Sequence, residues 1–68
     1  METGNAREAT EAVRDFLAEM GVDALSSPLR ATRRGGRWIV DFAVGYKHMR
    51  FLVDATTGKI VQYVTIKD

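Results

Sequence analysis

The chain has 68 residues, enough for one domain with a single hydrophobic core. It contains no cysteine, which excludes disulfides and thiolate metal sites. An apolar fraction of 46% is ordinary for a folded domain and too high for a disordered chain. The net charge of +1 is unevenly spread: residues 1–25 hold six acids and two arginines, and residues 26–68 hold eight cations and three acids. This predicts an acidic surface beside a basic one.

No segment of the sequence predicts export or membrane insertion. The first residues lack a basic stretch followed by an apolar one, and no apolar run approaches the ~18 residues that span a bilayer. We therefore expect a cytoplasmic location, or an extracytoplasmic one if a signal segment preceded this sequence in a longer protein.

Residues 6–20 are predicted to form an amphipathic helix. Asn5 and Glu8 have the spacing of a capping box, and Gly21 stands where a helix C-terminus favours glycine. Between these points apolar residues recur at steps of three and four, the period of a helix. They are Ala9, Val13, Phe16, Leu17 and Met20.

A connector is expected after the helix. Ser26, Ser27 and Pro28 indicate a turn, and Leu25 and Leu29 are expected to cover the edge of the core. Beyond this point the apolar period changes from 3.6 to 2, which indicates strands.

Three turns divide the remaining chain into four strands. They are predicted at Gly35-Gly36, at residues 45–48 and at residues 54–59. The fold class is therefore α+β, one N-terminal helix packed on a four-stranded antiparallel β-meander. Residues 1–68 are expected to form a single domain.

The expected strand registers direct one apolar set toward the helix. Arg30 faces Asp41 in the first hairpin, Phe42 faces Phe51 in the second, and Phe51 faces Val64 in the third. The predicted core comprises Val13, Phe16, Leu17, Met20, Trp38, Val40, Phe42, Phe51, Val53 and Val64.

Two stretches of the predicted sheet carry a family resemblance. Residues 37–42 read Arg-Trp-Ile-Val-Asp-Phe, and residues 50–61 read Arg-Phe-Leu-Val-Asp-Ala-Thr-Thr-Gly-Lys-Ile-Val. Together with the preceding helix they resemble the PepSY domain over most of the chain. The resemblance implies a small interaction module without catalytic residues. PepSY domains occur in propeptides of secreted thermolysin-like metallopeptidases, which they are thought to inhibit, and in stand-alone small proteins.

Little in the sequence supports catalysis, a metal site or a cofactor. The two serines, Ser26 and Ser27, lie in the connector, away from any expected base. The single histidine, His48, is expected in a solvent-facing turn, and one histidine cannot anchor a zinc site. Asp41 and Asp54 are expected among arginines, which favours ion pairs over metal binding. We predict a protein that is no enzyme and has no cofactor or small-molecule substrate.

The sheet face away from the helix is the first predicted binding surface. Alternation places more apolar residues there than a solvated face requires, and such clusters often mark interfaces. The residues are Ile39, Ala43, Leu52, Val61 and Tyr63. A homodimer, or docking to a partner protein such as a peptidase, is predicted; scattered exposed apolar residues are the alternative interpretation.

The first hairpin is the second predicted surface. Arg30, Arg33, Arg34 and Arg37 lie within eight residues, beside Trp38. Such a cluster can hold phosphates while an aromatic ring stacks on bases, so nucleic-acid binding is the alternative function. The register, however, places Trp38 on the core side under Arg33, a cation–π arrangement. Protection of an edge strand against aggregation is the favoured interpretation.

Overall fold

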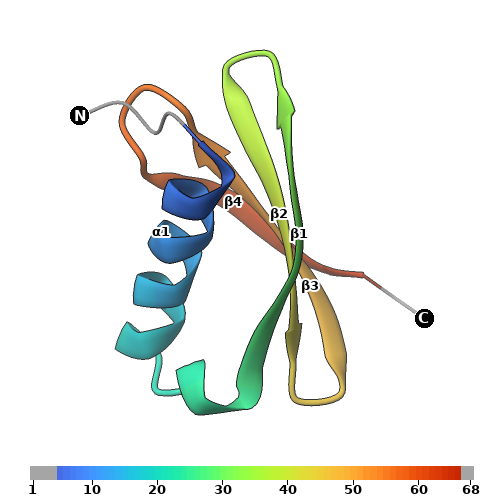
Figure 1. Ribbon diagram of the computed structural model, residues 1–68. Coiled ribbons are helices and arrows are strands. Elements are labelled where there is room, and N and C mark those ends of the chain that lie inside the picture. The colour runs from blue at the N-terminus through green and yellow to red at the C-terminus, as the bar shows by residue number, and fades with distance from the viewer. Residues whose placement is uncertain (1–4, 67–68) are drawn as a thin grey trace.

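The computed structural model describes residues 5–66 and confirms the predicted α+β fold. Each strand pairs antiparallel with the next one in the chain, in the order β1-β2-β3-β4. The helix covers one face of this twisted sheet, so the molecule has two layers (Figure 1). The elements are α1 Ala6–Glu19, the 3₁₀ turn η1 Asp23–Leu25, β1 Ser26–Arg34, β2 Arg37–Val44, β3 Lys47–Asp54 and β4 Ile60–Ile66.

Helix α1 begins where the capping pattern predicts. The Asn5 side chain accepts a hydrogen bond of 2.9 Å from the Glu8 backbone N–H, which satisfies one of the free donors of the first turn. The helix ends at Glu19, and Gly21 has a φ of 77° just beyond it. Met20 is the C-terminal cap and is exposed, so its predicted place in the core is wrong.

The core lies between α1 and the sheet face that α1 covers. Phe16 and Met49 pack against its margin. Because so small a domain has one core, the side chains buried in it supply most of its hydrophobic stabilisation. The buried apolar residues are Ala9, Val13, Leu17, Trp38, Val40, Phe42, Phe51, Val53 and Ala55.

Strand β1 begins earlier than predicted. Ser26 is its first residue, so Pro28 lies in a strand opposite Phe42 and not in a turn. An edge strand accommodates proline because it pairs with a neighbouring strand on one side only, so fewer of its backbone N–H groups are required for hydrogen bonds. Leu29 forms a bulge without an opposite residue. Leu29 and Leu25 are both exposed, so the prediction that they cover the core is wrong.

The first hairpin has the predicted register between Arg30 and Asp41, but the bulge puts Pro28, and not Leu29 as predicted, opposite Phe42. Gly35, with a φ of 61°, opens its two-residue turn. Arg34 is opposite Arg37, and Arg33 is opposite Trp38. The Arg33 guanidinium carbon lies 5.8 Å from the centre of the indole ring, which confirms the predicted cation–π contact.

The second hairpin turns more tightly than predicted. Gly45, with a φ of 64°, and Tyr46 alone form the turn between β2 and β3. Phe42 is therefore opposite Met49 and not opposite Phe51. The register differs from the prediction by two residues, so every side chain keeps its predicted face.

The turn between β3 and β4 is where the sequence predicts it. The Asp54 carboxylate accepts hydrogen bonds from the backbone N–H groups of Thr56 and Thr57, at 2.7 and 3.0 Å. These two bonds, with Thr57 the stronger influence, lower the pKa of the Asp54 carboxyl. Ala55 donates from its backbone to Gly36 at 2.9 Å, which ties this turn to the first hairpin.

A bulge at Val61 shifts the last strand by one residue from its predicted register. Phe51 is opposite Tyr63 and not opposite Val64. The Tyr63 ring thus lies on the helix side of the sheet, 5.4 Å from the ring of Phe16. Val64 points to the other face and is exposed, so its predicted place in the core is wrong.

Candidate functional site

The sheet face away from α1, called the open face below, is a mixed polar and apolar surface. Residues paired across neighbouring strands point to the same face, so they form rows that run across the sheet. On this face, arginine side chains such as Arg30 and Arg34 lie on β1, and apolar side chains such as Leu52 and Val64 lie on β3 and β4. Three rows cross all four strands: Thr32–Ile39–Leu52–Gln62, Arg30–Asp41–Arg50–Val64 and Ser27–Ala43–His48–Ile66.

The predicted apolar patch does not form one surface. Ile39 and Leu52 are opposite each other on the open face, but both are half-buried among their neighbours. Val61 occupies the bulge of β4. Tyr63, contrary to the prediction, lies on the helix side. The bulge causes this error, since a slip of one residue exchanges the two faces of a strand.

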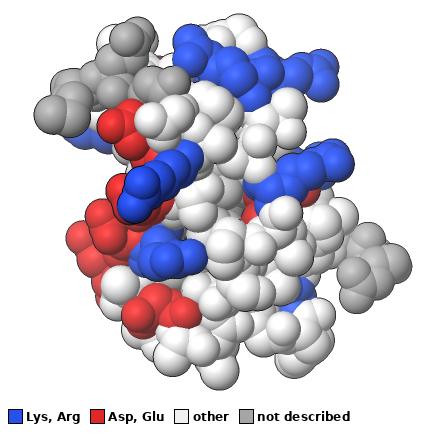
Figure 2. All heavy atoms as spheres, in the orientation of Figure 1, with Lys and Arg blue, Asp and Glu red and all other residues white. Residues whose placement is uncertain are grey.

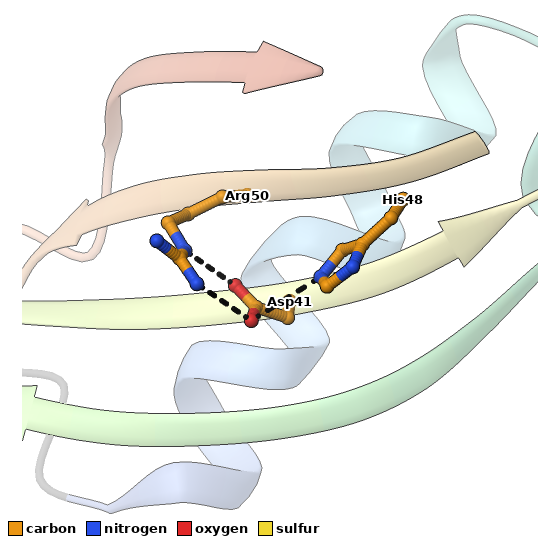
Figure 3. Close-up of polar contacts among 3 residues, drawn as sticks. All are labelled: Asp41, His48 and Arg50. Atoms are coloured by element: carbon orange, nitrogen blue, oxygen red, sulfur yellow. Dashed lines mark hydrogen bonds and ion pairs between the residues drawn. The ribbon is translucent and has the colours of Figure 1, made fainter. Parts of the chain in front are cut away.

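Asp41 is the one charged side chain buried among the described residues 5–66 (Figure 3). Arg50, directly opposite on β3, donates from Nε to Oδ1 at 2.9 Å and from Nη2 to Oδ2 at 3.2 Å. This two-bond contact confirms the predicted ion pair of Asp41 with an arginine. The Arg50 hydrogen bonds lower the pKa of the Asp41 carboxyl, burial opposes the effect, and His48 adds to it.

His48 is the second residue of β3, so its predicted place in a turn is wrong, and its side chain lies on the open face with 35% of its surface exposed. Its Nε2 atom lies 3.3 Å from Asp41 Oδ2. The contact has ion-pair distance but not hydrogen-bond geometry, which leaves Nε2 buried without a hydrogen-bond partner. Figure 3 shows the imidazole and the Arg50 guanidinium approaching Asp41 from two sides.

Ser27, which shares a row of the open face with His48, lies two strands away from it, because β2 lies between their strands. Neighbouring strands are about 4.8 Å apart, so the two backbones are separated by about 10 Å, beyond hydrogen-bond reach. Within residues 5–66, no three His, Asp or Glu side chains converge as metal ligands would. The Asp41–Arg50 ion pair links β2 to β3.

The basic hairpin divides between the two faces of the sheet. Arg30, Arg34 and Arg37 belong to the open face, whereas Arg33 lies on the helix side with the buried Trp38. The indole is therefore covered and offers no stacking platform. Figure 2 shows basic side chains gathered at the end of the molecule where this hairpin turns, and acidic ones over α1.

A hollow on the open face adjoins the basic hairpin. It has a volume of about 220 Å³ and passes over the Asp41–Arg50 pair. Because Asp41 balances the charge of Arg50, the excess positive charge of the hollow comes from β1. Its lining residues are Arg30, Thr32, Arg34, Ile39, Asp41 and Arg50.

Strand β4 is an exposed edge that the sequence reasoning did not single out. It ends the strand order, so among residues 5–66 no strand pairs with one row of its backbone N–H and C=O groups. Val61, Tyr63 and Val64 are 50%, 47% and 43% exposed. No charged residue occurs between Ile60 and Ile66. The lack of charged residues in this segment is visible in the sequence and could have indicated an edge strand suited to pairing.

No family model, curated protein or solved structure matches this chain. The similarity to the PepSY domain therefore remains a prediction based on the residues quoted above. Among residues 5–66, no helix has the length and apolar content to cross a membrane.

Proposed function

We propose that this chain is a non-catalytic, PepSY-like protein-binding module that accepts an extended strand of its partner along the free edge of β4. Strand addition of this kind uses backbone hydrogen bonds for affinity and alternate side chains for specificity. The partner is a protein, and inhibition or regulation of a peptidase is the role that the PepSY resemblance suggests.

The contrast between the two sheet edges is the observation that carries the proposal. The β1 edge bears Pro28, a bulge at Leu29 and several arginines, all features that discourage strand pairing. The β4 edge has a bulge at Val61 but neither proline nor charge. An apolar, uncharged edge strand is disfavoured in proteins unless another strand covers it.

A photocrosslinking experiment tests the proposal. A photoreactive phenylalanine analogue at Gln62 is expected to form a covalent adduct with a defined polypeptide in native cells. The same probe at Thr32 is the matched control, because Thr32 occupies the same row of the open face at the opposite edge. Mass spectrometry identifies the adduct as a second copy of the chain or as another protein.

The adduct at Gln62 should disappear when Val64→Arg is added, because a charge beside the probe disfavours strand pairing. Equal adducts from Gln62 and Thr32, or none from either, would contradict the proposed use of β4.

Nucleic-acid binding through the basic hairpin is a second candidate. The shared orientation of Arg30, Arg34 and Arg37 favours it, and the burial of Trp38 weighs against it. A labelled oligonucleotide should then bind with an affinity that falls with salt, and Arg34→Gln should reduce the salt slope by about 1. Arg14→Gln, on the exposed surface of α1, is the control. Absence of binding at low salt eliminates this candidate.

A further inference from the structure

We infer that the strand received by β4 is the β4 strand of a second copy of this chain, paired antiparallel about a two-fold axis at Tyr63. This inference rests on the proposed function, because it assigns the occupant of the same edge. The unpaired backbone row defines that occupant as an extended strand.

The absence of charge on β4 favours a second copy. When two identical strands pair antiparallel, a charge near the two-fold axis comes close to its own copy, and the two like charges repel each other. Strand β4 reads Ile-Val-Gln-Tyr-Val-Thr-Ile, a β-branched and aromatic sequence with no charged residue. This composition is typical of segments that self-associate. A partner strand that is recognised by its charge would find no opposite charge between Ile60 and Ile66.

The length of β4 sets the register. Strand β4 runs from Ile60 to Ile66, and the antiparallel overlap centred on Tyr63 pairs the residues from Val61 to Thr65, with the bulge at the end of the overlap. Tyr63 then meets Tyr63, and Gln62 of each copy is opposite Val64 of the other. The contact uses the same surface on both copies, as a two-fold dimer requires.

The two-fold axis runs perpendicular to the sheet, so both copies of α1 lie on the same side of one continuous eight-stranded sheet. Tyr63 lies on that side and contacts Phe16 and Phe51, with ring centres 5.4 and 5.8 Å away. Tyr63 is half exposed and Phe16 only partly buried. Pairing brings the two aromatic clusters together and removes this remaining apolar surface from water.

The unequal edges limit the assembly to two copies. An apolar edge at each side of the sheet would permit open-ended growth into a fibre. Here the outer edge of the pair is β1, which differs from β4 in carrying Pro28 and the arginines at positions 30, 33 and 34. Association through β4 therefore stops at a dimer.

Light scattering coupled to size exclusion tests the inference. The wild-type chain is expected to show the mass of a dimer. The variant Gln62→Arg/Val64→Arg places two arginine pairs opposite each other across the axis, and should raise the dimer dissociation constant at least about tenfold. Thr32→Arg adds the same kind of charge in the same row at the β1 edge, and is expected to leave the dimer intact.

Circular dichroism melts of all three proteins show whether each variant is folded. Should the double variant unfold, hydrogen exchange on the wild type replaces it: the outward amides of β4 should become protected as concentration rises, and those of β1 should not. A wild-type monomer at about 1 mM overturns the inference. A dimer that persists in the folded double variant also overturns it. If the wild type is monomeric and the Gln62 probe crosslinks another protein, the dimer fails while the proposed function stands.

Discussion

Truncation of Phe51 to alanine is expected to unfold this domain at room temperature. Phe51 is completely buried at the centre of β3. Its ring meets those of Phe16, Phe42 and Tyr63, with centres 6.0, 6.2 and 5.8 Å apart. Removing such a ring costs about 3–5 kcal/mol, through lost burial and the cavity left behind. A domain this small has a total stability of only about 5 kcal/mol.

The measurement is a urea titration followed by far-ultraviolet circular dichroism. Phe42→Ala should behave like Phe51→Ala, because Phe42 is equally buried. Tyr46→Ala is the control: Tyr46 lies in the β2–β3 turn, is 90% exposed, and its loss should change stability by less than about 0.5 kcal/mol. A cooperative transition of unchanged midpoint in both phenylalanine variants would refute the assignment of the core face.

Replacement of Asp41 by asparagine is expected to lower the free energy of unfolding at pH 7 by about 2 kcal/mol. The substitution keeps the size of the side chain but removes the charge that attracts Arg50 and His48. Hydrogen bonds to a charged group each contribute about 1.5–3 kcal/mol, and the half-exposed Arg50 can recover part of this by solvation.

The contribution of the Asp41 carboxylate to the free energy of unfolding should decrease as the pH falls. Its pKa is lower in the folded chain than in the unfolded one, so the unfolded state binds the proton first as the pH falls. The stabilisation is therefore complete above about pH 4, the ordinary value for aspartate, and is lost as the pH falls through the lower folded value. Asp54, whose pKa is also lowered, contributes in the same direction.

Thermal melts between acidic and neutral pH measure this effect. The stability difference between the wild type and Asp41→Asn should narrow as the solution is acidified. Asp15→Asn removes the same charge from the exposed surface of α1 and should change stability at pH 7 by less than about 0.5 kcal/mol. A constant difference between wild type and Asp41→Asn across this range would show that the ion pair does not support the fold.

The helix and the first hairpin could be predicted because their signals are local. Asn5 and Gly21 mark the two ends of α1, and Gly35-Gly36 sets the turn from which the Arg33–Trp38 pairing follows. Each of these features depends on residues only a few positions apart. The α+β architecture followed from them together with the change of apolar period.

The bulges could not be predicted because they interrupt a pattern that looks regular. Apolar and β-branched residues fill β4 on both faces, so alternation does not reveal that Val61 is an extra residue. Val64 was therefore predicted to face the helix, whereas Tyr63 does so in the structure. The tighter turn at Gly45 had a smaller consequence, since a shift of two residues preserves the faces.

The candidate site could be predicted only in part. The open face and its apolar pair, Ile39 and Leu52, follow from alternation alone. The position of His48 against Asp41 depends on the turn geometry at Gly45, which the sequence leaves open between two and four residues. The importance of the β4 edge depends on the strand order, in which no other strand of residues 5–66 covers it.

The consecutive strand order also bears on how the chain reaches its fold. Each of the four strands pairs with the strand next to it in the chain, so the loops that must close are short. Short closures cost little chain entropy before contacts form, and low contact order is associated with rapid folding. The hairpins can therefore form one after another, while the docking of α1 onto the sheet completes the domain.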